Sequence, residues 1–264
     1  MILDKIAAGA YKRVENAKKE KSLKEIEKEA YGLALEANGG FPFAKALKKA
    51  GLSFICEIKR ASPSKGVIAD GFPYTDIAKE YAAAGADAVS VLTEPEFFLG
   101  RDEYLTAVSR AVNLPLLRKD FIVDEYQIYV ARLIGASAVL LISALLNAEK
   151  IGRFLEIARN LGLSVLAETH SREEIDMALD GGAEIIGVNN RDLRTFEVDL
   201  RTSERLRPFI PKSATFVSES GIKSRADVEF LEGIGADAVL IGEYIMRAND
   251  KSAYLKELKG YKAI

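Results

Sequence analysis

Apolar and polar positions follow two alternating patterns along this chain. Short runs of β-branched and other apolar residues, typical of strands buried on both faces, are separated by longer amphipathic stretches with helical spacing. From residue 53 onward the two patterns alternate, which predicts successive β-strand and α-helix units. The predicted strands are Ser53–Lys59, Asp87–Leu92, Pro115–Lys119, Ala138–Ser143, Ser164–Glu168, Glu184–Val188, Thr215–Ser218 and Asp237–Ile241.

The amphipathic stretches between these runs predict one helix after each strand. A Gly-Ala pair precedes four of the strands, at Gly85, Gly135, Gly182 and Gly235. Glycine readily adopts the left-handed conformation that ends a helix, so each pair marks a joint between a helix and the next strand. The predicted helices are Tyr74–Ala84, Arg101–Val112, Asp124–Ile134, Ala148–Leu161, Arg172–Leu179, Leu200–Phe209, Arg225–Ile234 and Lys251–Leu258.

Eight strands in one chain favour a closed (β/α)8 TIM barrel, because an open sheet of that size would leave two edges to protect. We therefore expect residues 1–264 to form a single α/β barrel domain, with a barrel core at 53–264. Residues 1–52 predict an N-terminal helical extension that covers one end of the barrel and includes a short helix at Ala44–Ala50. The apolar stripe predicted for its first helix consists of Ile2, Ile6, Tyr11 and Val14.

Composition narrows the class of protein. Apolar residues make up 48% of the chain and charged residues 29%, with a net charge of -2, so we expect a packed globular protein without a nucleic-acid-binding surface. The sequence contains neither a signal-peptide pattern nor an apolar run long enough to cross a membrane. The lone Cys56 fits a reducing compartment and a buried packing role. We expect a cytoplasmic protein, monomeric, that binds a small molecule.

Charged and amide side chains gather where the predicted strands end. Catalytic groups of such barrels come from these carboxyl-terminal strand ends, so the side chains should meet at one mouth. Any one of them could be a rim salt bridge, but several strands share the feature, and a mixed Lys/Glu cluster suits proton transfer. Alternation along the first strand places Glu57 and Lys59 on the same face. The other residues of this set are Lys119, Glu168, Asn189, Arg191 and Glu219.

Small residues follow the last two strands, in Ser220-Gly221 and Gly242-Glu243. Phosphate often binds there in barrels, although glycines can also serve only to turn the chain. The Ser-, Pro- and Gly-rich segment 60–66 could be a mobile lid or an ordered surface loop. His170, the only histidine, has no metal-ligand partners at the usual spacing, and no dinucleotide or P-loop motif is present, so we expect neither a metal nor a cofactor.

These segments resemble the signatures of the indole-3-glycerol-phosphate synthase family. The resemblance spans the whole chain and includes the N-terminal helical extension. The matching motifs are CEIKRASPSKG at 56–66, LTE at 92–94 with Phe97 and Phe98, LRKDFI at 117–122, GVNNRDL at 187–193 and SESGI at 218–222.

The resemblance implies ring closure of 1-(2-carboxyphenylamino)-1-deoxyribulose 5-phosphate, with loss of carbon dioxide and water, to indole-3-glycerol phosphate. It implies that Lys119 donates a proton to the ketone oxygen, that Lys59 pairs with the substrate carboxylate, and that Glu168 is the general base with Glu57 as its partner. Asn189, Arg191 and Glu219 would hold substrate groups and the lysines. Positions matching the family's phosphate site are Ser62, Ser220, Gly221, Gly242 and Glu243, and Phe98 and Leu140 would flank the aromatic ring.

Two other interpretations stay open at this stage. One is a related barrel of the same pathway, phosphoribosylanthranilate isomerase or the tryptophan synthase α-subunit, which would not account as well for Lys59, Lys119 and Glu168. The other is a non-catalytic barrel that binds a phosphorylated metabolite or a partner protein.

Overall fold

A computed structural model describes residues 2–36, 40–69 and 71–261. Within them, eight parallel strands close a barrel in which neighbours follow chain order, and β10 pairs with β1. Each predicted strand is confirmed to within one residue at either end. The strands are β1 Ser53–Ile58, β4 Ala88–Leu92, β5 Leu116–Lys119, β6 Ala138–Ile142, β7 Ser164–Thr169, β8 Ile185–Asn189, β9 Thr215–Glu219 and β10 Ala238–Ile241.

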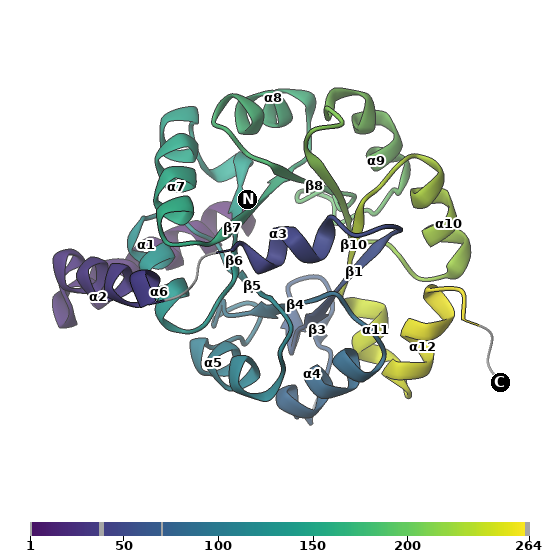
Figure 1. The fold of residues 1–264 in the computed structure, drawn as a ribbon, viewed down its shortest axis with the longest axis horizontal. Helices are drawn as coiled ribbons and strands as arrows, with labels where there is room; N and C mark the ends of the chain where they lie inside the picture. The colour runs from purple at the N-terminus through teal and green to yellow at the C-terminus, as the bar shows by residue number, and fades with distance from the viewer. Residues whose placement is uncertain (1, 37–39, 70, 262–264) are drawn as a thin grey trace.

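Helices surround this barrel as an outer ring (Figure 1). At the four predicted joints the glycines have φ between 79° and 94°, so the left-handed helix ends are confirmed. The ring consists of α4 Tyr74–Ala83, α5 Asp102–Ala111, α6 Tyr126–Leu133, α7 Ala148–Asn160, α8 Arg172–Asp180, α9 Arg201–Leu206 with the 3-10 turn η2 Arg207–Phe209, α10 Arg225–Gly233 and α12 Lys251–Leu258. The sequence did not predict α11 Glu243–Arg247, the 3-10 turn η1 Ser143–Leu145, or the hairpin of β2 Ala61–Ser62 and β3 Gly66–Val67.

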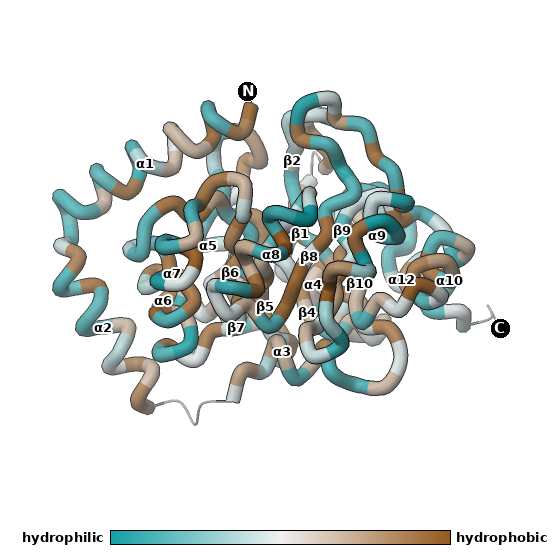
Figure 2. Tube along the Cα trace, turned by 90° about the horizontal axis from the view of Figure 1, so that it is seen from above, coloured by the Kyte–Doolittle hydropathy of each residue, from teal (hydrophilic) through white to brown (hydrophobic). Residues whose placement is uncertain are grey.

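The N-terminal segment forms three helices, α1 Ile2–Glu20, α2 Leu23–Glu36 and α3 Pro42–Leu47. Helix α3 closes the amino-terminal end of the barrel, because Phe43 and Leu47 are buried against the interior side chains. The predicted bounds of this helix, Ala44–Ala50, were wrong by two and three residues, since Pro42 provides a favourable first helical position. Figure 2 shows α3 at one end of the barrel and the start of α1 at the other, which is also the end where β2 lies.

The buried stripe of α1 consists of Leu3, Ile6, Ala7, Ala10 and Val14. Tyr11 was wrongly assigned to it: this side chain is 43% exposed, and its ring lies 5.4 Å from Lys150 Nζ. With 3.6 residues per turn, position 10 rather than 11 lies between Ile6 and Val14 on the inner face.

Alternation along the strands sorts the core into two clusters. Inward-facing side chains fill the barrel, and outward-facing ones, including the fully buried Cys56, pack under the helix ring. Burial raises the pKa of the Cys56 thiol well above its usual value, so this residue packs as an inert apolar group. Among the described residues, no helix combines the length and apolar character that crossing a bilayer requires.

Candidate active site

The inward-facing positions of the strands change from apolar to charged toward their carboxyl ends. Ile55 is followed two residues later by Glu57, and Leu117 by Lys119 in the same manner. Because side chains on one face recur every second residue, the apolar layers of the barrel support a charged layer directly above them. β7 and β9 repeat this arrangement with Glu168 and Glu219.

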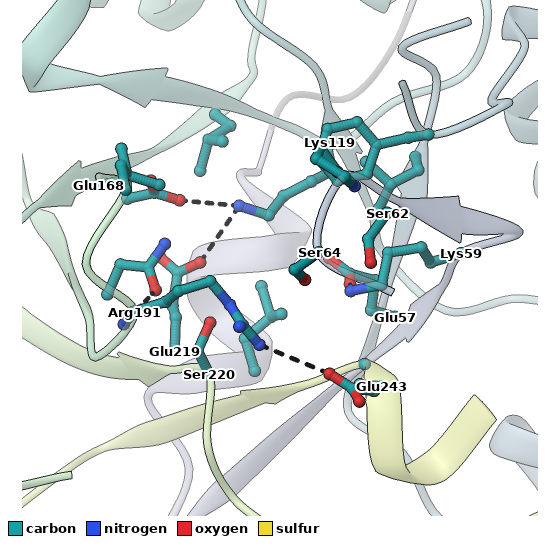
Figure 3. Close-up of a pocket in the computed structure, with 18 of the residues that line it drawn as sticks. Glu57, Lys59, Ser62, Ser64, Lys119, Glu168, Arg191, Glu219, Ser220 and Glu243 are labelled. Carbon is teal, nitrogen blue, oxygen red and sulfur yellow. Dashed lines mark hydrogen bonds and ion pairs between the residues drawn. The ribbon is translucent and has the colours of Figure 1, made fainter. Parts of the chain in front are cut away.

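Lys119 is the centre of the charged layer (Figure 3). Its Nζ lies 2.8 Å from Glu168 Oε2 and 3.3 Å from Glu219 Oε2. Burial acts to lower the pKa of Lys119, but the negative charges of Glu168, Glu219 and Glu57 outweigh it and raise the pKa above its usual value. The ammonium group is therefore charged.

The two carboxylates beside Lys119 have opposite pKa shifts. Burial alone would raise the pKa of Glu168, but the charges of Lys119 and His170 and a hydrogen bond with Asn189 lower it. Burial raises the pKa of Glu219 to about 7; Lys119 opposes this shift and the neighbouring Glu168 adds to it. Two neighbouring carboxyl groups whose pKa values are shifted in opposite directions are typical of proton-transfer sites.

Lys59 and Glu57 form a second pair on β1, with Nζ 2.6 Å from Oε1. Two glycines leave room for the carboxylates of the site. A Cβ atom on Gly242 would lie 2.3 Å from Glu57 Oε1, and one on Gly187 would lie 2.2 Å from Glu219 Oε1. Side chains at these positions would displace the charged groups, so the glycines are part of the geometry of the site.

The end of the site beside β9 and β10 carries positive charge. Arg191 Nη2 lies 3.5 Å from Glu243 Oε2, and Lys65 Nζ lies 3.6 Å from Glu243 Oε1. Ser220 and Gly221 have φ values of 70° and 87°, so two successive residues have left-handed backbone. Ser220 is strained there, and such local strain is common at ligand-binding sites.

Apolar side chains form the opposite wall. Phe98 and Phe121 have ring centroids 5.8 Å apart, and both line the cavity together with Leu140. Ile2, Leu3 and Ile6 of α1 complete this wall. These three residues and Phe121 were not predicted from the sequence to line the site. The apolar stripe of α1 was the available signal, but its packing against the mouth depends on the tertiary fold.

All of the site residues predicted from the sequence line one cavity of about 1140 Å³, which includes its opening to solvent. The structure thus brings together Glu57, Lys59, Ser62, Phe98, Lys119, Leu140, Glu168, Asn189, Arg191, Glu219, Ser220, Gly221, Gly242 and Glu243. That they share a cavity is an observation, and their individual roles stay predictions.

His170 lies behind Glu168. Its Nε2 is 3.8 Å from Glu168 Oε1, and its Nδ1 is 3.4 Å from Glu174 Oε2. Burial acts to lower the pKa of His170, but interactions with Glu174 and Glu168 raise it. Segment 60–66 forms the β2–β3 hairpin, and its Ser62, together with two neighbouring residues, reaches the cavity.

A family model described as indole-3-glycerol phosphate synthase matches residues 3–258. The chain is 55% identical over 260 residues to the indole-3-glycerol phosphate synthase of Ruminiclostridium cellulolyticum, which covers 98% of this chain and 99% of that protein. It is 53% identical over 259 residues to the protein of the same name from Endomicrobium trichonymphae, covering 98% and 100%.

Solved structures support the fold alone. A crystal structure of 3-hexulose-6-phosphate synthase from Salmonella typhimurium superposes with a TM-score of 0.66 at 14% identity, covering 80% of this chain and 98% of that one. A thiamine phosphate pyrophosphorylase from Pyrococcus furiosus gives a TM-score of 0.60 at 18% identity, covering 80% and 94%.

Proposed function

The chain belongs to the indole-3-glycerol phosphate synthase family, and from this premise we propose how its cavity carries the reaction. The enzyme closes the ring of 1-(2-carboxyphenylamino)-1-deoxyribulose 5-phosphate, with loss of carbon dioxide and water, in tryptophan biosynthesis. The observation that carries the assignment of roles is the position of Lys119 Nζ between Glu168 and Glu219.

Ring closure begins with attack of the carboxylate-bearing ring carbon on the ketone carbon. The ketone oxygen becomes a strong base as this bond forms, and it takes a proton from Lys119. The raised pKa keeps Lys119 protonated until this step, and the proton is transferred as the developing alkoxide becomes the stronger base. Release of carbon dioxide returns its bonding electrons to the ring and restores the aromatic system.

Dehydration then removes the former ketone oxygen. Lys59 gives this hydroxyl the second proton it needs to leave as water, and Glu168 takes a proton from the adjacent CH2 carbon. Two protons are given and one is recovered, so each turnover takes up one proton from solvent. Glu219 holds Lys119 in place, Glu57 holds Lys59, and Asn189 hydrogen-bonds Glu168.

The substrate spans the cavity from its basic end to its aromatic wall. We place the phosphate against Ser62, Ser220, Gly221 and Gly242, with Arg191 nearby, and the aromatic ring between Phe98 and Leu140. Arg191 and Lys65 offset the negative charge of Glu243 in this arrangement, because its carboxylate is turned to their side chains and holds those cations at the site.

Replacement of the general base tests this assignment. Glu168→Gln should keep substrate affinity and lose turnover by roughly 10²–10⁴-fold, with product followed by indole fluorescence. Glu173→Gln, at an exposed position of α8, is the matched control and should stay within a few-fold of wild type. A Glu168→Gln defect confined to KM would mean that Glu168 only positions the substrate. Tight binding without any turnover in the wild type would favour a non-catalytic binder.

We also propose that the enzyme works as a monomer in the cytoplasm. All of the predicted site residues belong to one chain, so the site needs no second subunit, and the buried Cys56 thiol suits a reducing compartment. Light scattering behind a sizing column should give the mass of a single chain; twice that mass would refute the monomer.

A further inference from the structure

Glu94 is a buried carboxylate that lies outside the catalytic set. It comes after β4 and is 0% exposed. Its Oε1 accepts a hydrogen bond from Glu96 N at 3.0 Å, and its Oε2 accepts from Phe97 N at 2.7 Å and from Phe98 N at 3.0 Å. Its own carbonyl accepts from Gly100 N at 2.8 Å. One residue therefore organises the whole turn from 94 to 100.

This turn carries the aromatic wall of the active site. Phe98 packs on Phe121, with 37° between the ring planes, and its carbonyl oxygen accepts a hydrogen bond from Ala61 N at 3.2 Å. Ala61 precedes Ser62 in the β2–β3 hairpin. A shift of the turn would therefore move the Phe98 ring, whereas the hairpin is also held by its own pairing of Ala61 with Val67 and of Ser62 with Gly66.

The counter-charge for Glu94 comes from the N-terminal helix. Arg13 Nη1 of α1 lies 3.4 Å from Glu94 Oε1 and 3.3 Å from Glu96 Oε1, and Nη2 lies 4.0 Å from Asp120 Oδ1. A carboxylate removed from water needs such a partner to remain charged. Asp120 follows Lys119 and accepts a hydrogen bond from Phe121 N at 2.8 Å, so Arg13 lies beside the carboxylates that bind the backbone of Phe98 and of Phe121.

We propose that Glu94, paired with Arg13, is a positioning residue that holds Phe98 in place and thereby sets the affinity of the site for the aromatic half of the substrate. This inference rests on the proposed placement of the aromatic ring beside Phe98. Only a carboxylate can serve three backbone N–H groups and a guanidinium at once. A glutamine amide would direct donors at donors.

The test measures binding of the two halves of the substrate separately, by calorimetry on the full-length chain. N-(2-carboxyphenyl)glycine represents the aromatic half and inorganic phosphate the other. Glu94→Gln and Arg13→Met should each lower the affinity for the aromatic probe by roughly tenfold, which is the effect of one lost charge-assisted contact. Both variants should leave the affinity for phosphate unchanged. With the complete substrate, KM should rise more than kcat falls. The double variant should bind the aromatic probe no more weakly than Glu94→Gln alone, because the two residues act as a pair.

Two controls make the outcome decisive. Arg153→Met removes an exposed arginine that pairs with Glu125 and should leave both affinities unchanged. Phe98→Ala should lower the affinity for the aromatic probe.

The pattern of these affinities decides between the outcomes. If Phe98→Ala lowers the affinity for the aromatic probe while Arg13→Met and Glu94→Gln do not, the role of Glu94 is refuted and the proposed ring site stands. If Phe98→Ala has no effect, the ring site itself is wrong. An equal loss of affinity for both probes in Glu94→Gln and Arg13→Met would mean general disruption of the cavity and would overturn the proposal. If Glu94→Gln does not fold, the affinities of Arg13→Met alone test the proposal, because Arg13 lies at a partly exposed position of α1.

Discussion

Substitution of Lys119 by methionine removes the cation that two buried carboxylates share. Nζ lies 2.8 Å from Glu168 and 3.3 Å from Glu219, so both lose their ion pair while their burial is unchanged. The pKa of Glu168, now lowered by Lys119, should therefore rise, and the protonated carboxyl can no longer act as a base. One substitution thus removes the acid and weakens the base. Loss of one such group costs roughly 10²–10⁴-fold in rate, or about 2.7–5.4 kcal/mol in the barrier.

Initial rates at saturating substrate, followed by indole fluorescence, measure this loss for Lys119→Met, Glu168→Gln and the double variant. Circular dichroism checks that each variant is folded, and Lys79→Met, at an exposed lysine of α4, is the matched control. Because Lys119 and Glu168 work as a unit, the double variant should be about as slow as the slower single variant. Wild-type turnover in folded Lys119→Met would refute the reasoning, and fully multiplicative losses would refute the coupling.

Three further predictions concern the neighbours of this pair. The raised pKa of Glu219 favours its protonated form in the folded state, so its contribution to stability is lost as the pH rises through about 7. Glu219→Gln should therefore gain stability relative to wild type between about pH 5 and pH 8 in urea titrations, and a constant difference would contradict this. Gly187→Ala should lower turnover at least tenfold, because the added methyl group displaces Glu219. The control Gly152→Ala on α7 has open space around its Cβ, so it should keep full activity and add about 0.5–1 kcal/mol of stability. Equal activities of the two variants would exclude the steric argument. The pKa of His170 is raised by Glu174 and Glu168 against the effect of burial, so His170→Gln should lose stability mainly below about pH 6.5, with a deficit that shrinks as the pH rises further; a pH-independent deficit would show that His170 is neutral throughout.

The barrel could be predicted from the sequence because each unit repeats the same local signals. Strands buried on both faces are short apolar runs, and the joints before them carry a glycine in a left-handed conformation, as at Gly85 and Gly235. The charged layer could be predicted for a related reason. Glu57 and Lys59 follow Ile55 at spacing two, so alternation alone places them on the inner face of the barrel.

Other features depend on contacts between segments that are distant in the chain. The helix α11 has only five residues, too few for a periodic pattern, and the β2–β3 hairpin has two residues in each strand. Glu94 lies in a turn where a buried charge cannot be recognised without its partner Arg13, which is 81 residues earlier in the chain. The packing of Ile6 against the mouth likewise requires knowledge of where α1 crosses the barrel.

The most direct test of the account is a crystal structure of Lys119→Met with the unreacted substrate bound. In this structure the phosphate should contact Ser220 and Gly221, the aromatic ring should lie against Phe98, and the substrate carboxylate should lie near Lys59. The ketone oxygen should point to the place that the Lys119 ammonium occupies in the wild type. A substrate bound in the opposite orientation, or outside the cavity between Lys59 and Glu168, would contradict it.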